Sequence, residues 1–316
     1  MTQIPVTPDD IRAAYARVTP YIRKTPVLEL AKGALGGDFT PVFKLEFTQH
    51  AGSFKTRGAF NSILSNNIGA AGVAAASGGN HGAAVAYAAR TLGVKARIFV
   101  PEISPQAKVA AIRRFGAEIV IGGAQYDDAQ AACDAYVAET GAFKIHPFSA
   151  QATIAGQGTL ALEWAAETKL DTVVIAVGGG GLISGAAAWL MGSGVKVVGV
   201  EPEGSRALQA ALAAGGPVEV RVASVAADSL GARNVGDLVY SICRAGVDHV
   251  VTVPDAAIID AIATLWRDYR LLSEPGGAAA LAAVLSGAYC PAPGERVGIL
   301  LCGGNVDLAK AVEWVA

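Results

Sequence analysis

The sequence is poor in charged residues. They account for only 16% of the 316 residues, whereas hydrophobic residues account for 52%. This balance excludes a disordered chain and predicts a folded protein of one large or two medium domains. The formal net charge of −2 gives no electrostatic basis for binding nucleic acid or an anionic membrane, so we expect neither partner.

Cysteine is also scarce. The sequence has no C-x-x-C pair and no cluster of cysteine with histidine; its four cysteines are Cys133, Cys243, Cys290 and Cys302. This pattern argues for reduced thiols in a cytoplasmic protein and against a structural zinc site. The segment from Met1 to Arg12 is polar and contains two prolines, which is not the pattern of a signal peptide.

The window 172–195 is uncharged and long enough to resemble a membrane span. It contains seven glycines, four of them consecutive, directly after a strand-like apolar run. A buried strand followed by a glycine turn explains this pattern better than a membrane helix. We therefore expect a soluble protein.

Several motifs of nucleotide-binding proteins and hydrolases are missing. No Gly-Lys pair occurs, which excludes a Walker-A loop, and G-x-G-x-x-G fails when it is started at Gly178 or at Gly179. The missing G-x-G-x-x-G motif argues against a nicotinamide dinucleotide, although Glu201, twenty residues after Gly181, has the spacing of the acidic residue that accompanies this motif. Neither G-x-S-x-G nor H-E-x-x-H is present. The histidines are dispersed, and a structural role is favoured for His50, His146 and His249.

What the sequence does contain is a regular alternation of strand and helix patterns. Strands are expected at 95–100, 118–121, 142–146, 172–177, 196–200, 247–253 and 296–301, with short extended segments at 25–28, 43–46 and 72–77. Helices are expected at 9–18, 56–65, 83–92, 127–140, 154–167, 182–191, 255–270 and 275–285, from Ser104-Pro105 to Gly116, and at the C-terminal end. The region 215–246 predicts loops. This alternation predicts an α/β fold with a parallel sheet and crossover helices.

One of the ten lysines lies in an unusual setting. Lys55 stands between Phe54 and Thr56, where a strand end at 43–46 is followed by an amphipathic helix at 56–65. The unpaired N–H groups and the dipole of a helix N-terminus favour anions nearby. Most lysines are solvated surface residues, so this position alone leaves a surface role and a chemical role open.

Three glycine-containing joints lie where strands give way to helices: 78–82, 178–181 and 302–305. Glycine lets the backbone approach a ligand closely, and a helix N-terminus behind it can hold a phosphate or a carboxylate. Ligands on open α/β sheets gather outside the carboxyl ends of the strands, so we expect these joints to face one cleft. Tight turns would explain any single joint. Three joints together with Lys55 indicate an anionic cofactor.

Six motifs occur in order along nearly the whole chain. They are Ser53-Phe54-Lys55-Thr56-Arg57-Gly58-Ala59, Ser77-Gly78-Gly79-Asn80-His81-Gly82, Ile154-Ala155-Gly156-Gln157-Gly158-Thr159, Gly178-Gly179-Gly180-Gly181-Leu182, Glu274-Pro275 and Cys302-Gly303-Gly304-Asn305. Together they resemble the threonine/serine dehydratases, pyridoxal-phosphate enzymes with the tryptophan-synthase-β-type fold, a family that includes serine racemase. Because the chain ends at Ala316, it resembles the short form without a C-terminal regulatory domain.

The resemblance implies pyridoxal 5′-phosphate as the cofactor and assigns residues to it. Lys55 would bind the cofactor covalently and, once freed by the substrate, would move the Cα proton. Phe54 would pack beside the ring, and Asn80 would hydrogen-bond its 3′ oxygen. The phosphate would be held by the backbone N–H groups of Gly178, Gly179, Gly180, Gly181 and Leu182.

The resemblance also assigns the remaining site residues. The loop that grips the substrate carboxylate would consist of Ser77, Gly79, Asn80 and His81. Glu274 would belong to the cofactor site, although a glutamate before a proline can also be a simple loop charge. Cys302 would face the pyridine nitrogen, its alternative being a small buried hydrophobic residue. A neutral thiol cannot hold that nitrogen protonated as a carboxylate would, which favours expulsion of a β-hydroxyl.

Two departures from serine racemase point to elimination without racemisation. Racemases have a serine two places before the motif's asparagine as the second acid/base, and this chain has Gly78 there. Racemases also bind a divalent cation through a glutamate, a carbonyl four residues on and an aspartate six residues on. Here Glu201 is followed by Ser205 and Ala207, so no metal is expected.

The resemblance implies β-elimination from L-threonine and L-serine, which yields a 2-oxo acid and ammonia. Three alternatives remain open. They are the same chemistry on another hydroxy amino acid (3-hydroxyaspartate or a substrate of the hydroxyectoine-pathway type), serine racemisation, and a non-catalytic ligand-binding protein. Binding alone does not require Lys55, which argues against the last alternative.

The resemblance further implies two domains, each an open, mostly parallel sheet flanked by helices. Residues 1–71 and 149–316 would form a large cofactor-binding domain, and residues 72–148 a small domain. The partner would be a small amino-acid substrate. A homodimer or homotetramer would be the assembly.

Overall fold

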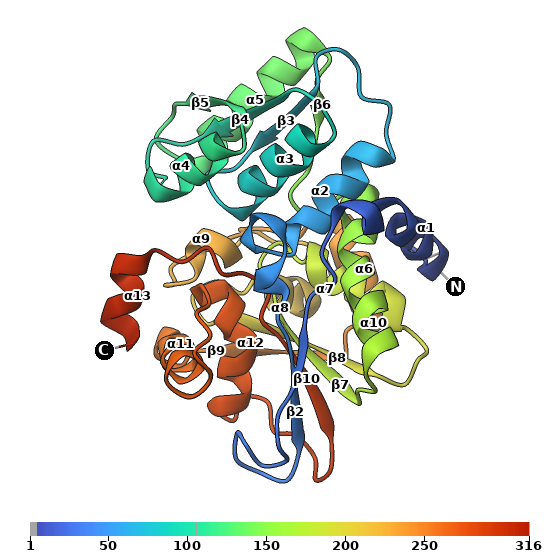
Figure 1. Ribbon diagram of the computed structural model, residues 1–316, viewed down its shortest axis with the longest axis vertical. Helices are drawn as coiled ribbons and strands as arrows, with labels where there is room; N and C mark the ends of the chain where they lie inside the picture. The colour runs from blue at the N-terminus through green and yellow to red at the C-terminus, as the bar shows by residue number, and fades with distance from the viewer. Residues whose placement is uncertain (1–4, 105, 316) are drawn as a thin grey trace.

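Two sheets organise the structure, a computed structural model that describes residues 5–104 and 106–315. The larger sheet has six strands in the order β1-β2-β10-β7-β8-β9, and the smaller has four in the order β5-β4-β3-β6. Only β1 runs antiparallel to its neighbour in the larger sheet, and the smaller sheet is parallel throughout. The sheets lie in separate lobes, and helix α2 (Lys55–Leu64) runs between them (Figure 1).

The strands are short. Those of the larger sheet are β1 (Val27–Glu29), β2 (Thr40–Lys44), β7 (Thr172–Ala176), β8 (Lys196–Pro202), β9 (His249–Val253) and β10 (Arg296–Leu300). Those of the smaller sheet are β3 (Val73–Ala76), β4 (Ala96–Val100), β5 (Glu118–Ile121) and β6 (Phe143–Lys144). Because all four of the latter lie within 73–144, the smaller sheet is made from one continuous stretch of chain.

Helices connect nearly all of these strands. In addition to α2 they are α1 (Pro8–Val18), α3 (Asn80–Thr91), α4 (Gln106–Arg114), α5 (Tyr126–Thr140), α6 (Gln151–Glu167), α7 (Gly181–Leu190), α8 (Ala207–Ala214), α9 (Ala227–Leu230), α10 (Gly236–Gly246), α11 (Asp255–Tyr269), α12 (Pro275–Leu285) and α13 (Leu308–Val315). The 3₁₀ turns are η1 (Thr19–Tyr21), η2 (Glu46–Thr48) and η3 (His50–Gly52).

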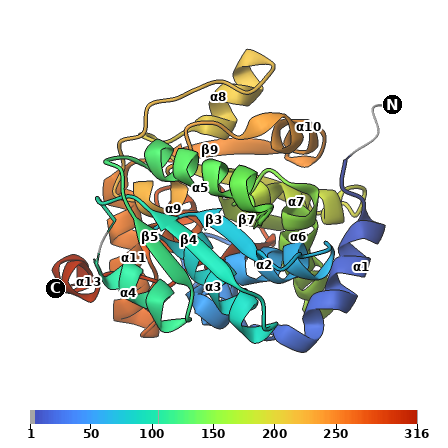
Figure 2. The ribbon, with the colours of Figure 1, turned by 90° about the horizontal axis from the view of Figure 1, so that it is seen from above.

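The smaller sheet is covered on both faces. Helices α3 and α4 lie on one side of it and α5 on the other (Figure 2). Residues of β3 alternate accordingly: Val73 and Ala75 share a core with α3 and α4, whereas Ala74 and Ala76 share a core with α5. The two-residue period of a strand sends successive side chains to opposite faces, so a continuous apolar run is what a parallel strand buried on both faces requires.

The larger sheet has the same layered arrangement. Helices α11, α12 and α13 lie on one side and α6, α7 and α10 on the other (Figure 1). All five residues of β7 are buried, as expected for a central strand covered on both faces. No helix within 5–104 and 106–315 is long and apolar enough to cross a membrane.

The predicted α/β fold with two helix-flanked sheets is confirmed, with local corrections. The region 215–246 was predicted to form loops, but its last third is helix α10, whose Val239, Ile242 and Cys243 are buried in the core of the larger lobe. The glycines at both ends of α10 obscured the helical spacing of these apolar residues. Helix α8 was not predicted either. Pro105, expected at the start of α4, lies outside the described residues.

Candidate active site

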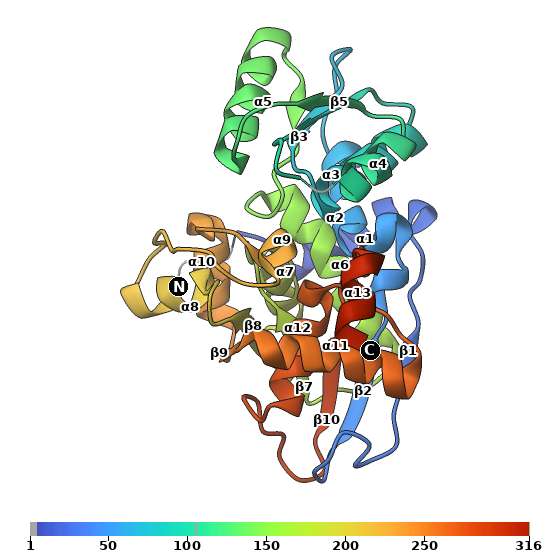
Figure 3. The ribbon, with the colours of Figure 1, turned by 90° about the vertical axis from the view of Figure 1, so that its left-hand side faces the viewer.

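The predicted site residues come from loops at the carboxyl ends of parallel strands. Segment 77–79 follows β3, segment 177–180 follows β7 and segment 301–304 follows β10, while Lys55 follows β2 after the turns η2 and η3. In Figure 3 the ends of β2, β7 and β10 point from the larger lobe toward α2 and the smaller lobe, to which β3 belongs. Open α/β sheets bind ligands at this edge.

Lys55 is the first residue of α2 and is half-buried. Its Nζ atom donates a hydrogen bond to the carbonyl oxygen of Pro147 at 2.7 Å. Removal from water lowers the pKa of Lys55 to about 8, against the opposing effect of nearby Glu274. An amine with this pKa is partly neutral at physiological pH, and a neutral amine is a nucleophile and a base.

Phe54 lies next to this amine. Its ring centroid is 5.2 Å from Lys55 Nζ, and its backbone N–H donates to the carbonyl oxygen of Cys302 at 3.2 Å. A β-bridge between Ser53 and Gly303 runs alongside. The lysine segment is thereby joined to the end of β10.

The four-glycine loop leads into helix α7. Gly180 has φ 80°, a left-handed backbone that an L side chain rarely adopts. Within the described residues, the backbone N–H groups of Gly178, Gly179 and Gly180 have no hydrogen-bond partner. Leu182 is buried behind the loop, in the core of the larger lobe. Unpaired N–H groups at a helix N-terminus form a site for an anion such as phosphate.

A second set of predicted residues surrounds the N-terminus of α3. Ser77 Oγ accepts a hydrogen bond from the Gly79 N–H at 3.2 Å. The first-turn N–H groups of α3, including those of Asn80 and His81, have no partner within the helix. His81 Nε2 lies 2.9 Å from the Ile145 carbonyl oxygen, and burial together with the charge of Lys55 lowers its pKa to about 3. The His81 ring is therefore neutral and already engaged.

Asn80 connects two of the glycine joints. Its Nδ2 donates to Glu274 Oε1 at 2.5 Å, and its Oδ1 accepts from Asn305 Nδ2 at 2.7 Å. Glu274 is 3% exposed, and its second oxygen, Oε2, has no partner among the described residues. Burial raises the pKa of Glu274, against the effects of Lys108 and of the Asn80 hydrogen bond. A buried carboxylate oxygen without a protein partner is available to a ligand or to a water molecule.

Cys302 lies two residues beyond the end of β10 and is 3% exposed. Its thiol lies 3.5 Å from the Gly276 carbonyl oxygen, to which it donates. Burial, with Glu274 nearby, raises the pKa of the Cys302 thiol well above its usual range. This cysteine is a neutral thiol at physiological pH.

The structure brings the three joints around Lys55. The joints at 78–82 and 302–305 are in direct contact through Asn80 and Asn305. The four-glycine loop reaches Lys55 through Phe148, which follows Lys55's partner Pro147: a methyl group added at Gly181 would lie 2.8 Å from Phe148 Cα. All the residues predicted for the site thus lie at one edge of the two sheets.

The space beside Gly78 is already filled. A Cβ atom at Gly78 would collide with Ser104 Oγ and would lie 2.7 Å from Ser104 Cβ. The loop after β4 thus places a hydroxyl where a side chain at position 78 would be. The absence of a serine at position 78 therefore does not leave the space beside Gly78 without a hydroxyl.

Sequence reasoning missed several residues of the region. Asn305 was part of a recognised motif, and its contact with Asn80 could have been suspected from that. Pro147 and Phe148 carry no such signal. Lys108 of α4 and Asp228 of α9 form a 2.5 Å ion pair between the two lobes, and a pair 120 residues apart has no local pattern.

Glu201, the glutamate at which a racemase-type cation site would begin, lies near the end of β8. Its two carboxylate oxygens accept the backbone N–H groups of Leu208 and Gln209, both at 2.8 Å, at the start of α8. No group of three or more histidine, cysteine, aspartate or glutamate side chains in the described part of the chain could hold a metal ion. That the protein uses no metal stays a prediction.

Comparison with known proteins gives consistent matches. The family model described as "Pyridoxal-phosphate dependent enzyme" matches residues 18–303. Phenylserine dehydratase from Ralstonia pickettii is 38% identical, over 98% of this chain and 97% of that protein. Serine racemase from Oryza sativa subsp. indica is 38% identical, over 96% of this chain and 92% of that protein.

Solved structures agree with these relatives. Maize serine racemase aligns with a TM-score of 0.92 and 36% identity, over 98% of this chain and 96% of the other. Serine racemase from Dictyostelium discoideum aligns with a TM-score of 0.88 and 35% identity, over 96% of this chain and 99% of the other. The similarity therefore extends over both sheets.

Proposed function

Because the chain belongs to the family of pyridoxal-phosphate-dependent enzymes, we propose that it eliminates water from 3-hydroxy amino acids, with L-threonine and L-serine as substrates. The products are a 2-oxo acid and ammonia. One observation carries the proposal: the half-buried amine of Lys55, with its pKa lowered to about 8, lies among loops that present unpaired N–H groups.

The residues around Lys55 fit the cofactor. The unpaired N–H groups of the four-glycine loop suit its phosphate, and the unpartnered Oε2 of Glu274 lies among the buried polar groups next to Asn80. Phe54 and Cys302 would flank the ring. When bound, pyridoxal phosphate supplies a conjugated ring that stabilises negative charge at the Cα atom of an amino acid.

The protein groups divide the remaining work. The first-turn N–H groups of α3 and the Ser77 hydroxyl would bind the substrate carboxylate and fix the orientation of its Cα–H bond. Lys55, as a neutral amine, would remove the Cα proton. Cys302 remains a neutral thiol and cannot hold an adjacent nitrogen protonated as a carboxylate would. This favours the rapid loss of a β-hydroxyl over prolonged storage of charge.

The test measures ammonia and 2-oxo acid released from L-threonine, L-serine, phenylserine and 3-hydroxyaspartate by the purified protein with pyridoxal phosphate. We expect turnover of the first two and a visible absorbance band from lysine-bound cofactor. Lys55→Ala should remove the band and lower turnover at least about a thousandfold. Lys95→Ala, at an exposed lysine, is the matched control and should change neither.

Other results would redirect the proposal. Inertness toward threonine and serine with turnover of phenylserine or 3-hydroxyaspartate would keep the chemistry and change the substrate. A protein that binds the cofactor but turns over no amino acid would be a ligand-binding protein on this fold. An unchanged spectrum in Lys55→Ala would refute the role of Lys55.

Serine racemisation is a second candidate function. Two observations favour it: the likeness to serine racemases, and the Ser104 hydroxyl that fills the space beside Gly78. We expect D-serine formation from L-serine to be negligible beside ammonia release. If D-serine formation rivals elimination and Ser104→Ala abolishes it selectively, the racemase assignment replaces the dehydratase one.

We also propose the domain division 1–71 with 149–316, and 72–148, together with a homodimeric or homotetrameric assembly. The position of all four small-sheet strands within 73–144 supports the division. Proteolysis of the native enzyme should cut near residues 72 and 148 before it cuts elsewhere. Sedimentation analysis should give a mass of two or four chains, and a monomer would refute the assembly.

A further inference from the structure

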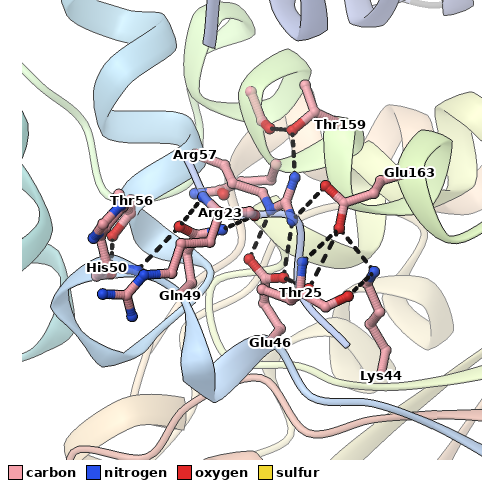
Figure 4. A network of polar contacts seen from close by, with 12 residues as sticks. Arg23, Thr25, Lys44, Glu46, Gln49, His50, Thr56, Arg57, Thr159 and Glu163 are labelled. Atoms are coloured by element: carbon pink, nitrogen blue, oxygen red, sulfur yellow. Dashed lines mark hydrogen bonds and ion pairs between the residues drawn. The ribbon is translucent and has the colours of Figure 1, made fainter. Parts of the chain in front are cut away.

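Beneath Lys55, on the other side of α2, lies a buried network of charges centred on Arg57. Its guanidinium donates to Glu46 from Nε at 2.6 Å and from Nη2 at 3.0 Å, and Nη2 also donates to Glu163 at 3.0 Å (Figure 4). Nη1 lies 3.5 Å from the Thr159 hydroxyl. Arg57 and Glu46 are fully buried, and Glu163 is 3% exposed.

The network continues to Lys44 at the end of β2. Lys44 Nζ donates to Glu163 at 2.7 Å, to Glu167 at 2.9 Å and to the Thr25 carbonyl oxygen at 2.8 Å. Burial would lower the pKa of Arg57, but Glu46 and Glu163 outweigh it and hold the group firmly charged. The charges of this network are thus paired with one another, and none of the proposed chemistry uses them.

The geometry of α2 links this network to Lys55. Successive residues of an α-helix are about 100° apart around the axis, so residues two apart are separated by about 200°. Lys55 and Arg57 therefore leave the first turn in nearly opposite directions, one toward Pro147 and the other toward Glu46 and Glu163. Whatever holds Arg57 fixes the rotation of that turn.

Helix α6 connects the first turn of α2 with the helix that follows the four-glycine loop. Gln157 accepts the Gly58 N–H at 3.2 Å, and a methyl group added at Gly156 would lie 2.7 Å from Gly58 Cα. On its other side, a methyl group at Gly158 would lie 2.9 Å from the Gly185 carbonyl oxygen of α7. The glycines bring three helices into backbone contact. Two of these, α2 and α7, begin at Lys55 and at the four-glycine loop.

We propose that Arg57 is a positioning residue, clamped by Glu46 and Glu163, that fixes the first turn of α2 and thereby aims Lys55 toward the cofactor phosphate loop. It acts through Lys55 and touches neither cofactor nor substrate. The motif at 154–159 adds to this restraint. Thr159 contacts Arg57, and Gly156 and Gly158 set the distance between α2 and α7. The inference rests on the role proposed above for Lys55.

The first test is Arg57→Lys in the holoenzyme. Lysine keeps the charge but cannot form the two-pronged contact with Glu46. We expect kcat to fall about tenfold to a hundredfold, with KM changed less than about twofold, because misplacement affects the reacting group more than binding. The attachment of the cofactor to Lys55 should slow by a similar factor. It is measured by absorbance after pyridoxal phosphate is added to the cofactor-free protein.

A second variant tests whether the effects of Arg57→Lys are caused by misfolding. Glu46→Gln with Arg57→Met removes a buried pair together, a change that is often tolerated in folding. It should remain folded at the assay temperature and still show the slow attachment and the lowered kcat. The matched control is Tyr289→Phe, which removes a buried hydroxyl 2.6 Å from Glu295 at the opposite end of the sheet. It should lower thermal stability without changing attachment or kcat.

The outcomes separate the two proposals. If Arg57→Lys and the paired variant attach cofactor and turn over substrate at the wild-type rate, the positioning role is refuted while Lys55 keeps its own. If Tyr289→Phe slows attachment as much as they do, the effect is general destabilisation and the proposal fails. If Lys55→Ala keeps the lysine-bound absorbance, the proposed function fails whatever Arg57 does.

Discussion

The two sides of helix α2 treat buried polar groups in opposite ways. On the Arg57 side, Lys44, Glu46, Arg57 and Glu163 are buried and paired with one another. On the Lys55 side, Glu274 Oε2 and Ser53 Oγ are buried within the described structure without any partner, and the glycine-loop N–H groups are unpaired as well.

This difference separates structure from function. A buried polar group costs free energy unless it is hydrogen-bonded, so a fully paired cluster serves the fold. A cluster of unpaired groups is instead available to a ligand. The predictions below perturb one side of α2 at a time.

The largest effect is expected on the paired side, from Glu163→Leu. The change leaves Arg57 and Lys44 without a shared carboxylate and should lower the free energy of unfolding by about 3–5 kcal/mol. Urea unfolding measures it. Arg296→Gln breaks an exposed ion pair with Glu29 and should have a far smaller effect. Equal losses in the two variants would contradict the distinction.

A smaller loss is expected from Gly180→Ala on the ligand side. Alanine at φ 80° should cost about 1–3 kcal/mol, and its methyl group would also collide with Val239. Gly192→Ala is the control, because Gly192 has φ 79° but open space around it. Both should lose stability. Only Gly180→Ala should weaken cofactor binding in a fluorescence titration, and equal affinities would refute the phosphate role.

The third effect is a pH dependence. Only the neutral amine of Lys55 can attack the cofactor, and burial lowers its pKa from 10.5 to about 8. The rate of cofactor attachment to the cofactor-free protein should therefore rise with pH up to about 8 and level off about one unit above. Stopped-flow absorbance across this range measures it. A rate that keeps rising toward pH 10.5 would show that Lys55 is not shifted.

The smallest change in stability is expected from Glu274→Gln. Since the buried Oε2 of Glu274 has no partner, loss of the charge removes a desolvation cost and should alter the free energy of unfolding by less than about 1 kcal/mol. Glu163→Gln, the same change on the paired side, should be clearly destabilising. Turnover should show the reverse order, with the larger loss in Glu274→Gln. Similar stability losses in both would undermine the comparison.

Much of the fold follows from local sequence patterns. The apolar runs at 172–177 and 296–301 correspond to the central strands β7 and β10, and the motif glycines mark the loops at their ends. Helix α10 was not predicted because its apolar residues lie between glycines in a region without clear strands. The lysine and the glycine loops were identified by motif, since each motif is local in the chain.

Contacts between distant segments could not be predicted in this way. The alternation of Lys44 and Glu46 with apolar neighbours indicates a half-exposed strand, yet both side chains are buried because Glu163 and Arg57 reach them from other helices. Likewise, no pattern near Gly78 in the sequence predicts that Ser104 lies beside it. Such pairs are set by tertiary packing, which one sequence without its structure does not specify.

The glycines of α6 reverse a familiar rule of protein engineering. Glycine inside a helix costs about 0.5–1 kcal/mol relative to alanine, so helix propensity alone would select alanine at Gly156 and Gly158. At those two sites the added methyl groups would meet the backbone of α2 and α7. A stabilisation campaign guided by propensity would thus push apart the helix that carries Lys55 and the helix that begins at the four-glycine loop.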